Sequence, residues 1–143
     1  MQDQTPLVTV GVPTYNRPKG LERTLQCILG QTYRNIRVII SDNCSTDREV
    51  LPLLQQYAAQ DSRVSYTVQE TNRSIVPNFQ YLLDQAAGDY FMWAADDDYW
   101  DANFIETCVQ AMEARPDVIL CMPDLHLTFE DGSARRAKLN RSF

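Results

Sequence analysis

The sequence of 143 residues has no long apolar run, few glycines and a minority of positive charge, and each shortage argues against a class of protein. No stretch approaches the roughly 18 apolar residues that a membrane-spanning helix needs. The 13 basic residues are outnumbered by 19 acidic ones, for a net charge of -6, which argues against binding to nucleic acid. The Gly-rich phosphate loops of dinucleotide-binding enzymes and Walker ATPases are missing as well.

Cysteine is also scarce, and its spacing excludes two kinds of site. None of the four cysteines forms a Cys-x-x-Cys pair, so neither a zinc site nor a redox pair is predicted. The first six residues lack the basic and apolar regions of a signal peptide. These features predict reduced thiols in a cytoplasmic protein. The basic run 135–138 fits a solvated face, with contact to the inner face of a membrane as the alternative.

What the sequence does contain is a regular alternation of two patterns. Its 44% hydrophobic and 22% charged residues are ordinary for a globular protein, and its length predicts a single domain over residues 1–143. Apolar runs rich in β-branched residues alternate with segments of helical periodicity. The predicted strands are 7–12, 36–40, 63–68, 90–94, 118–122 and 125–129. The predicted helices run from Pro18 to Leu29, from Thr46 to Tyr57, from Pro77 to Gly88 and from Asp101 to Met112.

This alternation is typical of βαβ units, and it predicts an α/β fold with a mostly parallel sheet flanked by helices. The strand 90–94 is apolar throughout and is predicted to be central. The tail from Ser133 to Phe143 is poorly patterned and is predicted to be frayed. In an open parallel sheet, ligands bind outside the carboxyl ends of the strands. That rule selects the most polar and acidic loops of the sequence, which are 13–17, 42–47, 69–74 and 95–100.

The strongest feature is the triplet Asp96, Asp97 and Asp98, directly after the strand 90–94. Three adjacent carboxylates repel one another and are costly without a compensating cation. Their oxygens suit Mg²⁺ or Mn²⁺, which keep coordination positions open for phosphate oxygens. A metal there would stabilise the charge on a departing diphosphate. The alternative is a solvated acidic turn in which Asp98 or Asp101 caps the next helix.

The other selected loops hold groups that suit a nucleotide. Asp42 follows the strand 36–40 and can accept hydrogen bonds from a ribose hydroxyl or a base N–H, with a plain Asx turn as the alternative. Pro13 stiffens the first loop, and the ring of Tyr15 can lie against a nucleobase. The guanidinium groups of Arg17 and Arg73 can pair with phosphate, although a surface salt bridge is the alternative for each.

Three segments together resemble a known family. VTVGVPTYNR, VIISDNCSTD and GDYFMWAADDDYW are similar, in order and spacing, to successive motifs of family 2 glycosyltransferases of the GT-A (Rossmann-like) fold. The resemblance covers roughly residues 7 to 124. It implies a nucleotide-diphosphate-sugar donor, commonly a UDP-sugar, bound with Mn²⁺ or Mg²⁺. It also implies inverting transfer of the sugar to an acceptor hydroxyl, in the synthesis of a glycan or polysaccharide.

The resemblance implies roles for the nucleotide side of the site. By motif position, Pro13, Tyr15 and Arg17 would line the nucleotide site, and Asp42 would contact the base. Arg73 would lie near the uracil or the diphosphate.

It also implies roles in the acidic motif. Asp96 would approach the ribose or the donor sugar, and Asp97 would ligate the metal with the help of Asp98. Many relatives have Asp-x-Asp-Asp here, which would put an aspartate at Ala95. The division of roles among the three aspartates therefore stays open at this point.

One expected part is missing from the motifs. The family's catalytic base is a carboxylate in a later motif, and neither Asp124 nor Glu130 matches it. The expectation is therefore the amino-terminal, donor-binding portion of a longer enzyme. A non-catalytic module that binds a nucleotide-sugar or a metal is the first alternative. A nucleotidyltransferase is the second, but it would need a Gly-rich loop with Lys or Arg after the first strand, and PTYNRP matches poorly.

Overall fold

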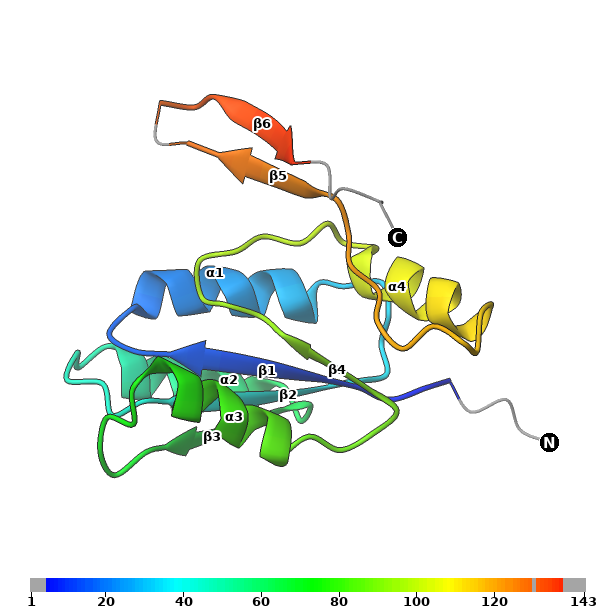
Figure 1. Ribbon diagram of the computed structural model, residues 1–143. Coiled ribbons are helices and arrows are strands. Elements are labelled where there is room, and N and C mark those ends of the chain that lie inside the picture. The colour runs from blue at the N-terminus through cyan, green and yellow to red at the C-terminus, as the bar shows by residue number, and fades with distance from the viewer. Residues whose placement is uncertain (1–4, 130, 138–143) are drawn as a thin grey trace. The chain divides into compact units, whose positions relative to one another are not determined.

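A four-stranded parallel sheet organises the amino-terminal part of the chain (Figure 1). The computed structural model describes residues 5–129 and 131–137, which fall into two compact units divided between Ile105 and Glu106. The sheet has the spatial order β3-β2-β1-β4, and its strands are β1 (Val8–Thr14), β2 (Ile36–Asp42), β3 (Val64–Val68) and β4 (Tyr90–Trp93). The connecting helices are α1 (Pro18–Leu29), α2 (Val50–Gln60) and α3 (Ile75–Asp84). The predicted α/β class with a parallel sheet is confirmed.

The sheet is covered on both faces, which explains why its strands are almost continuously apolar. Every residue of β1 is buried, and so is every residue of β2 except Arg37. Helix α1 contacts α2, whereas α3 packs on β1 and β2. In Figure 1, α1 lies above β1 and α3 lies below it. The fully buried side chains of this core include Val10, Val12, Leu21, Leu25, Ile28, Val38, Leu54 and Leu82.

The strand order creates a switch point beside β1. The chain steps from β1 to β2 to β3 in one direction, and then returns to place β4 on the other side of β1. The loops after β1 and β4 therefore diverge from neighbouring strand ends, which is where ligands bind in such sheets. The register pairs Gly11 with Trp93, so Asp96 comes level with Thr14 three residues later.

Two strand predictions are wrong. The strand 90–94 was expected to be central, but β4 is the edge strand of the described sheet, and Trp93 is 43% exposed. Apolar continuity reports what covers the two faces of a strand and carries no information about its neighbours in the sheet. The run 118–122 is irregular, with Ile119 96% exposed, because it pairs with no strand among the described residues.

The second unit contains a helix and a hairpin. Helix α4 (Phe104–Glu113) begins at the end of the first unit and continues into the second. Strands β5 (Leu125–Thr128) and β6 (Ala134–Ala137) pair antiparallel. The predicted strand 125–129 is confirmed, but the prediction of a frayed tail from Ser133 is wrong for β6. Gly132, at φ +80°, allows the reversal that gives β6 its partner, while Glu130 and 138–143 lie outside the described residues.

Helix starts were predicted less well than the helices themselves. Pro18 opens α1 as predicted, since its missing N–H costs nothing there. Helix α2 begins at Val50, well after Thr46, because the Thr46 side chain and N–H are bonded to Asn16. Helix α3 begins at Ile75, two residues before Pro77. Within the described residues, none of these helices has the length and hydropathy for a membrane span.

The Asp61–Arg63 pair between α2 and β3 yields a prediction about pH. Arg63 Nη2 lies 2.7 Å from Asp61 Oδ2, and Arg63 Nε and its backbone N–H both donate to Oδ1 at 3.0 Å. The hydrogen bonds from Arg63 lower the pKa of Asp61 below its ordinary value of 3.8. We expect Asp61→Asn to lose about 1 kcal/mol of unfolding free energy at pH 7. The difference should disappear as the pH falls from 4 through the lowered pKa, because the carboxylate is then protonated in the folded state too.

Urea denaturation at several pH values measures this difference. Asp84→Asn is the matched control, since it removes an exposed carboxylate whose partner, the Gln80 amide, can still donate to an Asn oxygen. A loss that persists unchanged at low pH would show that the ion pair is not its source.

Candidate functional site

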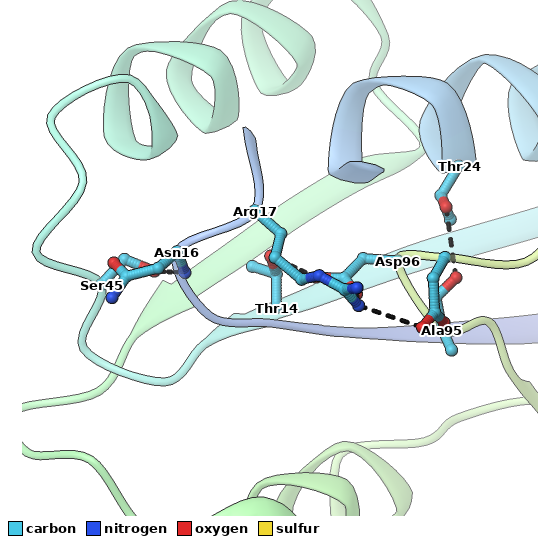
Figure 2. Close-up of polar contacts among 8 residues, drawn as sticks. Thr14, Asn16, Arg17, Thr24, Ser45, Ala95 and Asp96 are labelled. Carbon is cyan, nitrogen blue, oxygen red and sulfur yellow. Dashed lines mark hydrogen bonds and ion pairs between the residues drawn. The ribbon is translucent and has the colours of Figure 1, made fainter. Parts of the chain in front are cut away.

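The buried carboxylate of Asp96 connects the loops that follow β1 and β4 (Figure 2). Asp96 is 7% exposed, and each of its oxygens has a donor. Thr14 Oγ1, at the end of β1, donates to Oδ2 at 3.0 Å. Arg17 Nη1, just before α1, donates to Oδ1 at 3.0 Å. The switch point is thus held together by side chains from both of its loops.

Arg17 also reaches the next carboxylate. The same Nη1 atom lies 3.0 Å from Asp97 Oδ2, so a single nitrogen bridges two aspartates. The hydrogen bonds that Arg17 donates, first to Asp97 and then to Asp96, raise the pKa of Arg17. The Asp97 side chain is 55% exposed, whereas that of Asp96 is 9% exposed. Asp96 is therefore a fixed member of the cluster, and Asp97 faces solvent.

Asp98 completes the triplet with a different environment. The residue as a whole is exposed, but its carboxyl is partly desolvated, and this desolvation raises its pKa above 3.8. The negative charge of Asp97 raises that pKa further. Both causes disfavour the charged form of the Asp98 carboxyl.

Helix α1 contacts the acidic loop through three of its residues. Thr24 Oγ1 donates to the carbonyl of Ala95 at 3.2 Å (Figure 2). The Arg23 guanidinium lies 4.3 Å from the centre of the Tyr99 ring, a cation–π contact. Gly20 faces the backbone of Asp96 so closely that a Cβ atom there would lie 2.2 Å from the Asp96 carbonyl oxygen. The loop is therefore seated against α1 by backbone contact as well as by side chains.

Asn16 clamps the loop after β1 to the loop after β2. Its Oδ1 accepts hydrogen bonds from the backbone N–H groups of Thr46 at 2.8 Å and Asp47 at 2.9 Å. Its own N–H donates to Ser45 Oγ at 2.8 Å. Asn16 has a φ of 54°, in the left-handed region that Asn tolerates better than most residues. The neighbours of Asn16 in the chain are Tyr15, which is 43% exposed, and Arg17.

Asp42 is buried at the end of β2 and is already engaged. Its Oδ1 accepts from the N–H of Ser45 at 3.1 Å and from Ser45 Oγ at 2.5 Å. The N–H that Asp42 accepts lies three residues further along the chain, one residue beyond the Asx turn that the sequence left open as the alternative. Since Ser45 Oγ accepts from Asn16, Asp42 and the loop after β1 share one hydrogen-bond chain.

Arg73 is carried by a third loop that Asn43 holds in place. The Arg73 N–H donates to Asn43 Oδ1 at 2.8 Å, and Asn43 Nδ2 donates to Asn72 Oδ1 at 3.1 Å and to the Ser74 carbonyl at 3.2 Å. The exposed Arg73 side chain has its guanidinium 5.6 Å from the centre of the Tyr81 ring. Among the described residues, the Arg73 side chain has no bond to the acidic triplet, unlike that of Arg17.

Three of the predicted site residues, Arg17, Asp96 and Asp97, meet directly, and Pro13 is buried in β1. Asp42 and Arg73 lie at neighbouring strand ends, on loops held by asparagines. The sequence analysis missed the supporting residues Thr14, Asn16, Gly20, Thr24 and Asn43. Asn16 and Asn43 had a readable signal, because each lies in a loop selected at the end of a predicted strand.

Comparison with known proteins identifies the family that shares this arrangement. The model of glycosyl transferase family 2 matches residues 9–140. The chain belongs to this family. Glycosyltransferase GlyG of Streptococcus pneumoniae is 33% identical over 115 residues, which are 80% of this chain and 38% of that protein. The GalNAc(5)-diNAcBac-PP-undecaprenol beta-1,3-glucosyltransferase of Campylobacter jejuni is 30% identical over 106 residues, 73% of this chain and 34% of that enzyme.

Solved structures agree on the fold. TarS of S. aureus in complex with UDP-GlcNAc superposes with a TM-score of 0.71 at 24% identity, over 77% of this chain and 32% of TarS. The mannosyltransferase PcManGT from Pyrobaculum calidifontis in complex with GDP-Man and Mn²⁺ gives 0.66 at 25% identity, over 78% of this chain and 32% of that protein. The chain spans 14% and 45% of the length of two further curated relatives. It thus corresponds to a part of a family 2 glycosyltransferase.

Whether a divalent cation fits this family 2 site can be judged from its donors. Within residues 5–129 and 131–137, no three Asp, Glu, His or Cys side chains form a full metal cage. Mg²⁺ in nucleotide enzymes takes only one or two carboxylates, and phosphate oxygens and water complete its shell. The exposed carboxylates of Asp97 and Asp98 fit this smaller set.

Gly20→Ala tests whether the acidic loop is seated on α1. Alanine is the better helix former by about 1 kcal/mol, so propensity alone predicts a more stable protein. The close approach of the Asp96 carbonyl oxygen predicts the opposite. We expect the contact to win, with a net loss of about 1 to 2 kcal/mol of unfolding free energy in urea denaturation. Lys19→Ala, next to it on the exposed surface, is the control; a Gly20→Ala variant more stable than wild type would rule the contact out.

Two substitutions of Asn16 distinguish the effect of losing its side-chain hydrogen bonds from the effect of its left-handed backbone conformation. Asn16→Gly keeps the positive φ accessible but removes the acceptor of two N–H groups, and we expect a loss of about 1 to 2 kcal/mol. Asn16→Ala should lose about 1 kcal/mol more, because alanine also resists the left-handed conformation. Thermal or urea denaturation gives both values. Equal stability of the two variants would contradict the positive φ at this position.

Proposed function

We propose that this chain is the donor-binding portion of a metal-dependent glycosyltransferase that uses a nucleotide-diphosphate-sugar, with a UDP-sugar as the first candidate. The supporting observation is the meeting of Arg17, Asp96 and Asp97 at the switch point of the sheet. Guanidinium and exposed carboxylates at adjacent strand ends are suited to a diphosphate and its metal ion. Family membership supports the same reaction class. The product, by the same reasoning, is a glycan or polysaccharide.

The loops after β1, β2 and β3 are assigned to the nucleoside. Tyr15 offers an exposed ring for stacking on a base, and Pro13 fixes the strand end that carries it. Asp42 sits at the next strand end with one oxygen committed to Ser45. Arg73, on the loop after β3, offers a guanidinium to the base or the diphosphate. The clamps from Asn16 and Asn43 fix the spacing of these groups before the donor arrives.

The loop after β4 is assigned to the diphosphate and the sugar. Asp96, anchored by Thr14 and Arg17, orients the ribose or donor sugar, and Asp97 and Asp98 hold Mn²⁺ or Mg²⁺. A bound metal would neutralise charge on the leaving diphosphate. In the inverting reaction the acceptor oxygen bonds to the anomeric carbon as the bond to the diphosphate breaks, and a base removes the hydroxyl proton.

The non-catalytic module is kept as the second candidate on one observation. Asp124, a described carboxylate after the acidic triplet, is ion-paired with Arg136 on the β5–β6 hairpin. A carboxylate committed to a guanidinium is a poor proton acceptor. The base of the reaction is therefore assigned to a segment outside this chain, and the chain by itself is expected to bind the donor without transferring the sugar.

Calorimetric titration of UDP, with and without Mn²⁺, tests the donor site. We expect binding that depends on the metal, and we expect Asp97→Asn to weaken it at least about 10-fold, the loss that even indirect changes at metal sites cause. Asp84→Asn, at the end of α3 away from the strand carboxyl ends, removes an equal charge and should bind as wild type does. If none of UDP, GDP and dTDP binds, with or without Mn²⁺, the proposed function is refuted.

A further inference from the structure

We propose that Arg17 is the resident counter-ion of the acidic loop, and that it yields Asp97 when the divalent cation binds. Its guanidinium then becomes a contact of the donor diphosphate. The inference rests on the proposed function and deepens it, because it assigns one residue two successive partners. It follows from how the two hydrogen bonds of Arg17 differ.

The first observation is the sharing of one atom. Arg17 Nη1 contacts Asp96 and Asp97 at 3.0 Å each, in place of the two-nitrogen fork that arginine forms with a single carboxylate. A cation bridging two carboxylates does electrostatically what a divalent ion does between them. The guanidinium thus joins Asp96 to Asp97 before a metal is present.

The second observation decides which of the two bonds yields. The Asp96 side chain is 9% exposed and has a second donor in Thr14, so its bond to Arg17 is partly shielded from water. The Asp97 side chain and the Arg17 side chain are both 55% exposed. Exposed ion pairs contribute little, because water and salt screen them. A divalent cation therefore competes with Arg17 for Asp97 far more readily than for Asp96.

The third observation concerns where the guanidinium can turn. Arg17 directly precedes α1, whose first turn contains no acidic residue, and the carbonyl of Arg17 accepts the N–H of Leu21. The backbone of Arg17 is thus fixed by the helix while its side chain stays exposed. Once Asp97 binds the metal, the nearest unpaired negative charge is the diphosphate held by that metal. The guanidinium can follow it while keeping its bond to Asp96.

This exchange predicts effects of opposite sign for one substitution. In Arg17→Gln, Mn²⁺ alone should bind about 2- to 5-fold more tightly, because its competitor has gone, the range expected for loss of an exposed ion pair. UDP in the presence of saturating Mn²⁺ should bind about 10-fold more weakly, because a charged phosphate contact has gone. Electron paramagnetic resonance of free Mn²⁺ measures the first quantity, and calorimetry measures the second.

Two further variants control the experiment. Arg17→Lys keeps a positive charge and should fall between wild type and Arg17→Gln in both measurements. Arg37→Gln removes an exposed charge at the amino end of β2, far along the strand from the acidic loop, and should change neither. Damage to the fold would weaken both ligands together, so the opposite signs identify the exchange.

The outcomes separate this inference from the proposed function. If wild type fails to bind UDP with Mn²⁺, the donor site itself is refuted. If wild type binds but Arg17→Gln leaves the Mn²⁺ affinity unchanged or lowers it, Arg17 is not a competitor and the exchange is overturned. The same conclusion follows if neither protein binds Mn²⁺ without UDP.

Discussion

The hydrogen bonds of the Asp96 carboxylate are the constraint on which the site depends. They join Thr14, at the end of β1, to Asp96, in the loop after β4, and these two residues are 82 positions apart in the sequence. In this sheet the chain makes three crossovers, through α1, α2 and α3, before β4 lies beside β1, so most of the first unit is needed to place these two loops. Because Asp96 is only 7% exposed, its carboxylate would be costly without partners, and Thr14 and Arg17 remove that cost. The candidate site therefore depends on the same contacts that pack the switch point.

Rigidity in this site comes from amides more than from charges. Asn16 and Asn43 each hold a neighbouring loop by its backbone, and neither asparagine can titrate. Amide clamps leave the charged groups Arg17, Asp97 and Arg73 exposed at the surface of a fixed frame. A site that must accept a strongly charged ligand gains from this division, since its frame does not change when the charges rearrange.

The sequence predicts the strands and helices of the first unit well, and the order of the strands in the sheet poorly. The alternating patterns predict the four parallel strands and the loops at their carboxyl ends, because burial on two faces leaves a continuous apolar record. The same apolar pattern wrongly predicts that β4 is central and that 118–122 is a strand. The reason is that the hydrogen-bonded neighbours of a strand leave no signal in its own sequence. The acidic triplet could be found because three adjacent acidic residues are easily recognised in the sequence. Gly20 and Thr24 could not, because their role depends on contacts with a loop more than 70 residues away.

The roles of the three aspartates follow from the strand register more than from their order in a motif. Trp93 pairs with Gly11, and from there the chain directs Asp96 toward Thr14 while Ala95 turns its carbonyl to Thr24 on α1. Asp96 is buried by this geometry, and Asp97 follows it into solvent. The residue at which β4 leaves the sheet therefore decides which of these carboxylates is buried and which is exposed.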